Sequence, residues 1–285
     1  AGRDRFNATY RIEDLPAEGS LIHAGWVKLR HEGEEVSMST DENLCVDQAI
    51  TEINENGYII LRGFVDQQRV EDLGRLADKY FKPASAEARR AAATRGYADF
   101  DSEEAARTSL LVQTREVDDL VTDQRVLSIA EAVLLEGPSY YRRVRTAGTG
   151  FKDAFTDGED VRSLHRDGAI YPVRIPGKPL VLNTLLAIDE FTPEKGSTTF
   201  VPGSHLWDAP VDSEHETVAV EMDPGDLLLF GGEVWHGHGQ NRTNHPRRCL
   251  AMLYVCGWLQ PFNNYNVAFS DEALEKLPDK LAALI

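Results

Sequence analysis

The chain has 285 residues, of which 42% are hydrophobic and 27% are charged, a composition typical of a globular protein with a sizeable buried core. Its formal net charge of −17 disfavours nucleic acid and anionic membrane surfaces as partners. No apolar run of about 18 residues occurs, so the sequence predicts no membrane-spanning segment.

The three cysteines, Cys45, Cys249 and Cys256, are odd in number and form no C-x-x-C pair. This pattern disfavours a disulfide framework and favours a reducing, cytoplasmic compartment. The amino-terminal stretch AGRDRFNATYRIEDL lacks the apolar segment of a signal peptide, which agrees with that expectation.

The first half of the chain, about residues 1–137, is expected to be mainly helical. Helices with apolar side chains at helical spacing are predicted over residues 46–56, 66–82, 85–95 and 123–137. Between the first two lies GYIILRGFV (57–65), a β-branched run bounded by glycines that predicts a strand.

From about residue 138 to 260, short apolar runs alternate with Gly, Pro, Asp and Asn. Strands are predicted over residues 140–146, 179–188, 197–203, 217–222, 226–232 and 247–258. This pattern indicates a β-sandwich or barrel with helices packed outside it. The tail predicts a final helix, about 268–285, interrupted at Pro278. The chain, 1–285, is therefore expected to form a single domain.

The stretch SLHRDG places His165 and Asp167 two positions apart. On a strand or at its edge, this spacing turns both side chains to one side and Arg166 to the other. Two imidazoles and one carboxylate on one face of an octahedral ion are the ligand set of non-heme Fe(II) oxygenases. The downstream stretch VWHGHGQNRTNHPRR offers three candidates for the missing ligand, His236, His238 and His245.

An iron oxygenase that uses 2-oxoglutarate must also pair the remote carboxylate of this cosubstrate. The planar guanidinium of arginine suits this task. Arg247 lies eleven residues after His236, at the start of a predicted strand. A hairpin formed by GQNRTNHP would bring Arg247 back beside the strand that carries the ligand.

Five segments in chain order resemble the signature blocks of the phytanoyl-CoA dioxygenase family. They are GYIILRGFVD, SLHRDG, LLAIDEFTPEKGSTTFVPGSHLW, PGDLLLFGGEVWHGHGQNRTNHPRR and LYVCGW. The resemblance runs from about residue 55 to the carboxyl end. It implies a mainly β fold with flanking helices (α+β), a double-stranded β-helix or cupin-like jelly roll, and an oxygenase that uses Fe(II), 2-oxoglutarate and O2.

The resemblance also implies roles for individual residues. The iron ligands would be His165, Asp167 and His236, and Arg247 would bind 2-oxoglutarate. Asn183 falls where relatives place a polar contact to the cosubstrate; a buried amide satisfied by the backbone is the alternative.

Three further positions are less constrained by the family pattern. His238 stands where relatives often have a small or hydroxyl residue, which implies an outer-shell donor near the cosubstrate and not an iron ligand. Lys152 matches a basic residue that helps to bind the cosubstrate in some members; a solvated lysine is the alternative. Arg162 replaces a Gln that in many relatives touches cosubstrate or substrate, which indicates an adapted substrate pocket.

A fourth position, His205 in VPGSH, matches a structural turn of the family.

The implied reaction is oxidation, by default hydroxylation, of an unactivated C–H bond of a small molecule, with release of succinate and CO2. The carboxylate of Asp167 disfavours a halogenase, since related halogenases have a small residue there. Desaturation, cyclisation and endoperoxide formation stay open. The family and the negative charge together favour a neutral or cationic specialised-metabolite intermediate over an acyl-CoA.

Two other functions stay open on the sequence alone. A cupin-type metalloenzyme that does not use 2-oxoglutarate, such as another dioxygenase or an isomerase, would keep the three ligands without needing Arg247. A non-catalytic jelly-roll binding protein would bind metal without consuming O2.

Overall fold

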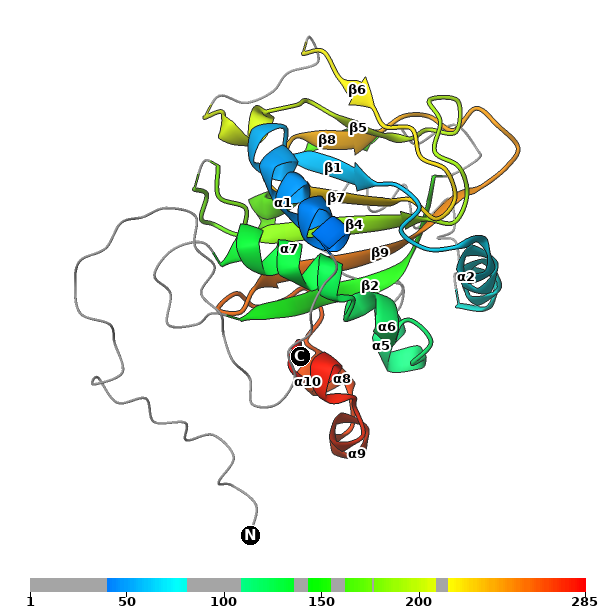
Figure 1. The fold of residues 1–285 in the computed structure, drawn as a ribbon, viewed down its shortest axis with the longest axis vertical. Coiled ribbons are helices and arrows are strands. Elements are labelled where there is room, and N and C mark those ends of the chain that lie inside the picture. Colours follow the sequence, from blue (N-terminus) through cyan, green and yellow to red (C-terminus); the bar gives the residue numbers. More distant parts are fainter. Residues whose placement is uncertain (1–39, 81–108, 136–142, 155–161, 176, 209–214) are drawn as a thin grey trace, which may run out of the picture. The chain divides into compact units, whose positions relative to one another are not determined.

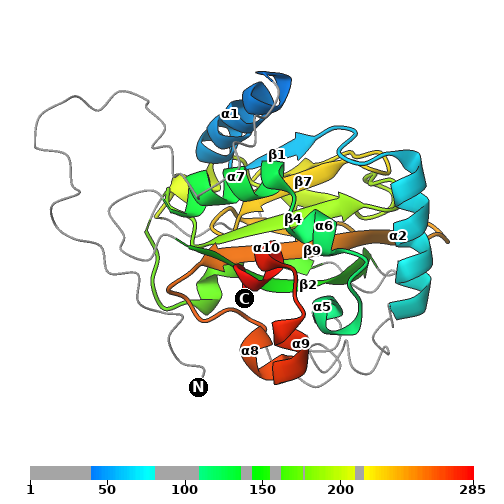
Figure 2. The ribbon, with the colours of Figure 1, turned by 60° about the horizontal axis from the view of Figure 1, so that its bottom comes forward.

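Two antiparallel sheets form the centre of the protein, and helices pack on the larger one (Figures 1 and 2). The computed structural model describes residues 40–80, 109–135, 143–154, 162–175, 177–208 and 215–285, and these belong to one compact unit spanning Ser39–Ile285. The helix predicted over 85–95 lies outside the described residues.

The larger sheet has five strands in the order β1-β7-β4-β9-β2. These strands are β1 (Tyr58–Leu61), β7 (Leu227–Gly231), β4 (Val181–Ala187), β9 (Arg247–Cys256) and β2 (Val144–Ala154). The smaller sheet has the order β3-β8-β5-β6, with β3 (Arg162–His165), β8 (His236–His238), β5 (Thr198–Phe200) and β6 (Val218–Ala219). Every pair is antiparallel, as a jelly roll requires.

The central strands of the larger sheet are covered on both faces. Every residue of β4 and β7 is buried. One face meets the smaller sheet through an apolar cluster that includes Leu185, Phe200 and Phe230. The other face meets helices, where Tyr254 donates a hydrogen bond to the carbonyl of Val121 at 2.9 Å. Double coverage explains why these strands have continuous apolar runs without polar alternation.

Two helices lie across the outer face of the larger sheet, α1 (Thr40–Glu55) and α7 (Gln124–Leu134) (Figure 1). The carboxylate of Asp123 caps α7 by accepting the backbone N–H of Arg125. The short helices α5 (Leu110–Gln113) and α6 (Asp118–Val121) precede α7. None of the described helices is both long and apolar enough to cross a membrane.

The helix α2 (Gln67–Tyr80) lies beside one end of the larger sheet (Figure 2). Asp66 accepts the backbone N–H of Arg69 at 2.8 Å, which confirms the predicted start of this helix. Arg248 anchors α2 to the sheet, since its guanidinium contacts Asp78 of α2 at 2.8 Å and Asp189 at 2.9 Å.

Two predicted elements, a strand and the final helix, differ in the structure. The strand predicted over 140–146 begins at Val144 and continues to Ala154, because its pairing with β9 carries a stretch of Gly, Thr and Ala that has little strand signal. The predicted final helix is three short helices, α8 (Tyr265–Ala268), α9 (Asp271–Glu275) and α10 (Asp279–Ala282). The break at Pro278 is confirmed, since this residue precedes α10.

The hairpin predicted between His236 and Arg247 is also wrong. The strand β8 belongs to the smaller sheet and β9 to the larger one, so the two do not pair. The intervening loop crosses from one sheet to the other. Arg247 therefore faces the interior from the opposite wall.

His205 lies in the 3-10 turn η4 (Ser204–Leu206) and is buried against the end of α1, with Nε2 3.0 Å from the carbonyl oxygen of Asn54. Burial lowers the pKa of its imidazole more than the Asn54 carbonyl raises it, and Arg174 lowers it further. The folded protein therefore keeps this ring neutral where an unfolded histidine, with a pKa of about 6.5, takes up a proton.

We expect the free energy of unfolding to fall as the pH drops below about 6.5, because the unfolded chain then binds a proton that the folded state excludes. His205→Gln removes this contribution. Between about pH 7 and about pH 5, the free energy of unfolding should fall less in the variant than in the wild type. The difference between the two should be at most about 1.4 kcal/mol per pH unit. Urea denaturation followed by circular dichroism measures both losses, and equal losses would contradict the assignment.

Candidate metal centre

Strand pairing brings the two halves of the candidate metal centre together. His165 ends β3 and lies opposite His236 of β8. Arg166 is extended, and Asp167 then opens the 3-10 turn η3 (Asp167–Ile170). The ligand atoms of His165, Asp167 and His236 all lie within 4.8 Å of one another, the one such group of His, Cys, Asp or Glu side chains in the described parts of the chain.

The carboxylate of Asp167 lies between the two imidazoles. His165 Nε2 is 3.4 Å from Asp167 Oδ1, and His236 Nε2 is 3.5 Å from Asp167 Oδ2. Two imidazole nitrogens and one carboxylate oxygen thus converge from one side. This donor set fits a non-heme iron with open positions on its other face.

Neighbouring groups fix the orientation of these side chains. The Nδ1 atom of His236 lies 3.0 Å from the carbonyl oxygen of Val234, so Nε2 is the nitrogen directed at Asp167. Asn183, buried on the inner face of β4, donates its amide to Asp167 Oδ2 at 3.0 Å. Outer-shell contacts of this kind set the tautomer and the direction of metal ligands.

The charge state of Asp167 suits a ligand. Burial by itself would raise the pKa of this carboxyl. The opposing effects of His236, of hydrogen bonds from both histidines and of Lys152 are together larger, and they hold the pKa well below its usual range. The carboxylate is therefore ionised at neutral pH.

Arg247 lies on the inner side of β9 and is 5% exposed. Its guanidinium carbon lies 4.2 Å from the centre of the Phe191 ring, and its backbone N–H donates to Asp153. Asp153 and Asp189 act on the guanidinium electrostatically, but Nε is buried without a hydrogen-bond partner among the described residues. A buried cation is costly unless it is paired, so this arrangement fits an anionic ligand such as the remote carboxylate of 2-oxoglutarate.

Lys152 and His238 also come from strands that border the interior. Lys152 is exposed and lies directly opposite the buried Cys249 in the β2–β9 register. Its charge contributes to the low pKa of Asp167, which places its ammonium within electrostatic reach of the candidate ligands.

His238 follows His236 by two positions on β8 and therefore points to the same side. It is half-buried, with Nδ1 3.0 Å from the carbonyl oxygen of Gly239. The backbone of Arg162 pairs with His238, but the Arg162 side chain lies outside the described residues. His245 is exposed in the loop.

Two residues near the site were not recognised from the sequence. Phe191, which lies between the strands predicted over 179–188 and 197–203, is fully buried and supports the Arg247 guanidinium. Glu233 is 2% exposed and lies three residues before His236. The signal for Glu233 was its position as a charged residue inside the apolar run LLLFGGEVW. Such a run predicts burial, and buried carboxylates are rare unless they are paired.

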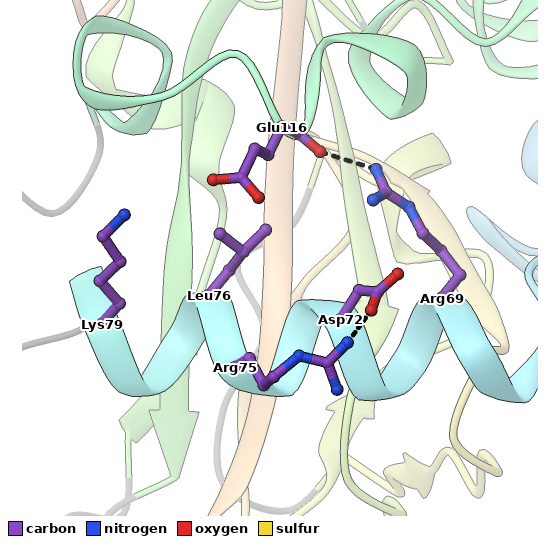
Figure 3. Close-up of a pocket in the computed structure, with 6 residues that line it drawn as sticks. All are labelled: Arg69, Asp72, Arg75, Leu76, Lys79 and Glu116. Carbon is purple, nitrogen blue, oxygen red and sulfur yellow. Dashed lines mark hydrogen bonds and ion pairs between the residues drawn. The ribbon is translucent and has the colours of Figure 1, made fainter.

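A surface pocket of about 370 Å³ lies elsewhere, between α2 and the segment around Glu116 (Figure 3). Two of its arginines have partners: Arg69 contacts the carbonyl of Glu116 and the carboxylate of Asp119, and Arg75 contacts Asp72. The pocket includes none of the candidate metal ligands, so it is separate from the metal centre.

We expect Asp167→Ala to weaken binding of Co(II), a spectroscopic substitute for Fe(II), by more than about 100-fold. Loss of a residue that only contacts a metal ligand costs up to about 100-fold in affinity, and loss of a ligand should cost more. The reason is that the variant lacks the one anionic donor of the group. Titration followed by the visible absorption of Co(II) measures the affinity. His245→Ala is the matched control and should bind as the wild type does; native affinity in Asp167→Ala would show that the metal binds elsewhere.

Two curated relatives share part of this sequence. The chain is 41% identical over 114 residues to Dioxygenase trt7 of Aspergillus terreus (strain NIH 2624 / FGSC A1156), a match that covers 38% of this chain and 40% of that protein. It is 42% identical over 106 residues to Dioxygenase cdmA of Talaromyces verruculosus, covering 35% and 36%. The matched stretch thus spans well under half the length of each relative.

A solved structure shares the fold. The epimerase SnoN, crystallised with Fe3+, alpha ketoglutarate and nogalamycin RO, superposes with a TM-score of 0.54 at 19% identity, covering 80% of this chain and 91% of that one. The predicted jelly-roll core with flanking helices is confirmed by this likeness and by the two sheets.

The family itself is shown by a match over most of the chain. The sequence profile of the phytanoyl-CoA dioxygenase (PhyH) family matches residues 53–249. This range includes all three candidate metal ligands and Arg247. The protein belongs to the phytanoyl-CoA dioxygenase family.

Proposed function

We propose that the protein is an Fe(II)/2-oxoglutarate-dependent dioxygenase that oxidises, by default hydroxylates, a C–H bond of a small molecule. The observation that carries this proposal is the buried guanidinium of Arg247, whose Nε has no hydrogen-bond partner among the described residues, in the same interior as the His165, Asp167 and His236 group. A metal site alone would suit many functions. A metal site facing a buried cation suits a cosubstrate that chelates at one end and is anionic at the other.

The metal centre and Arg247 both contact the same cluster of apolar side chains. Phe191, which supports Arg247, belongs to the same apolar cluster as Phe230. The ring of Phe230 packs against His236 with centroids 4.7 Å apart. The metal centre and the arginine therefore adjoin the same apolar cluster, whose side chains would exclude water from the reaction.

Each residue has a distinct role in this proposal. His165, Asp167 and His236 hold the iron, and Asn183 orients the Asp167 carboxylate from a position that also faces the cosubstrate. Iron bound there, together with 2-oxoglutarate, supplies the O2-dependent oxidation, in which substrate, 2-oxoglutarate and O2 become hydroxylated substrate, succinate and CO2.

Two cations on strands that border the interior are suited to bind the anionic cosubstrate. Arg247 pairs the remote carboxylate, and Lys152 adds a second cation within reach of the metal ligands. A protein of net charge −17 repels a dianion over most of its surface, so local cations are needed to bind one. We assign His238 to the same region as an outer-shell donor, and Arg162 to the substrate side.

For the substrate, we propose a small specialised-metabolite intermediate. Support comes from the related SnoN structure, which holds nogalamycin RO beside iron and alpha ketoglutarate. We place the protein in the cytoplasm, with no nucleic-acid or membrane partner; the buried, free thiols of Cys249 and Cys256 support a reducing compartment. Residues 1–285 would act as a single oxygenase domain.

We expect 2-oxoglutarate to bind the Co(II)-loaded protein and Arg247→Ala to weaken this binding by about 2–5 kcal/mol, because the substitution leaves a buried carboxylate unpaired. Isothermal titration calorimetry measures the affinity. Pyruvate, which chelates metal but lacks the remote carboxylate, should bind both proteins equally.

Arg248→Ala is the matched control for this experiment, since Arg248 faces α2 on the other side of the strand. It should leave 2-oxoglutarate affinity unchanged. With Fe(II) and O2, the wild type should release succinate. A protein that binds Co(II) but neither binds 2-oxoglutarate nor releases succinate would instead be a cupin-type metalloenzyme of another kind or a binding protein.

A further inference from the structure

A buried carboxylate lies directly behind the proposed metal ligand Asp167. Glu233 sits in the loop between β7 and β8, and its side chain faces Gly168, the residue after Asp167. The backbone of the same loop holds this turn, since Gly168 N–H donates to the carbonyl of Gly232 at 2.9 Å. The loop and the turn that carries Asp167 are thus in contact through both backbone and side chain.

The contact explains why position 168 is a glycine. A β-carbon there would lie 2.8 Å from Glu233 Cδ and closer still to Oε1, whereas the next neighbour, the Gly232 carbonyl oxygen, is at an ordinary 3.4 Å. Gly168 is not among the described glycines with positive φ. The glycine is therefore required by the space that Glu233 occupies and not by backbone conformation.

Two arginines lie near this carboxylate. Glu233 Oε2 is 3.3 Å from Arg174 Nε, and the Arg174 guanidinium also contacts Asp208 and the carbonyls of His205 and Trp207. The Arg166 guanidinium carbon lies 4.9 Å from the centre of the Trp235 ring, and the Glu233 charge acts on it electrostatically without a direct ion pair. Glu233 is thus ion-paired with Arg174 and partly balances the charge of Arg166.

Loss of the Glu233 charge would leave Arg174 with its contacts to Asp208 and to the carbonyls of His205 and Trp207, but it would remove the negative charge that acts on Arg166. The carboxylate nearest to Arg166 in the chain is that of Asp167 itself. A guanidinium paired with Asp167 would compete with a metal ion for the same oxygens, because one carboxylate cannot be fully shared by both. A neutral residue at 233 would therefore weaken the metal site without touching it.

We propose that Glu233 is a positioning residue for the metal centre, which keeps Asp167 directed at His165 and His236 by packing against Gly168 and by placing a negative charge near Arg166 and Arg174. The inference rests on the metal site of the proposed function, but not on 2-oxoglutarate or on turnover. It extends the site to a side chain to which the family resemblance assigned no role.

The test of the charge is Glu233→Gln, which keeps the shape of the side chain. We expect its dissociation constant for Co(II) to rise by about 10- to 100-fold, the usual cost of losing an outer-shell partner, and the visible spectrum of the saturated protein to change. Asp226→Asn is the matched control, because Asp226 is equally buried and ion-paired, with Arg62, but lies at the opposite end of β7. It should lower the thermal midpoint and leave Co(II) affinity and spectrum unchanged.

The test of the contact is a double-mutant cycle. Gly168→Ala should raise the Co(II) dissociation constant by about 10-fold or more. In Gly168→Ala/Glu233→Ala the added methyl group has room, so the double variant should bind Co(II) within about twofold of Glu233→Ala alone. This double-mutant cycle tests the contact even if the Glu233→Gln variant does not fold.

Native Co(II) affinity and spectrum in folded Glu233→Gln would overturn the proposal, as would a Gly168→Ala effect that persists in full without Glu233. Failure of the proposed function looks different. In that case the wild type binds Co(II) in an Asp167-dependent way but does not bind 2-oxoglutarate. A wild type that binds no Co(II) would overturn both.

Discussion

The pairing of β3 with β8 is the constraint on which the site depends. The register places His165 opposite His236, and the chain then turns within two residues to insert Asp167 between the imidazoles. A shift of one residue would point His165 or His236 to the other face of the sheet. Because β8 is only three residues long, its register is also held by β5 on its other side and by apolar packing of Phe200 and Phe230 around His236.

The larger sheet supplies the opposite wall of the site and the remaining polar groups. Asn183 reaches Asp167 from β4, and Arg247 enters the interior from the start of β9. These strands are rigid because α1 and α7 cover their outer face and the apolar cluster fills their inner face. In this framework the Arg247 guanidinium is held over the Phe191 ring, so it loses little side-chain freedom when an anion binds.

The candidate residues of the site could be named from the sequence, whereas their supporting structure could not. The H-x-D spacing singled out His165 and Asp167, and the resemblance of five segments to the phytanoyl-CoA dioxygenase family added His236 and Arg247. The path of the loop from His236 to Arg247 could not be predicted, because a crossing between two sheets and a hairpin use the same kinds of turn residue. The contact between Glu233 and Gly168 joins positions 65 residues apart, and neither residue carries a pattern that names the other.

The most direct measurement is a crystal structure of the protein with Fe(II) and 2-oxoglutarate, grown without O2. The account predicts one iron bound by the Nε2 atoms of His165 and His236 and by Asp167, with the remote carboxylate of 2-oxoglutarate against the Arg247 guanidinium. An iron that His236 does not bind, or a cosubstrate whose remote carboxylate lies away from Arg247, would contradict it.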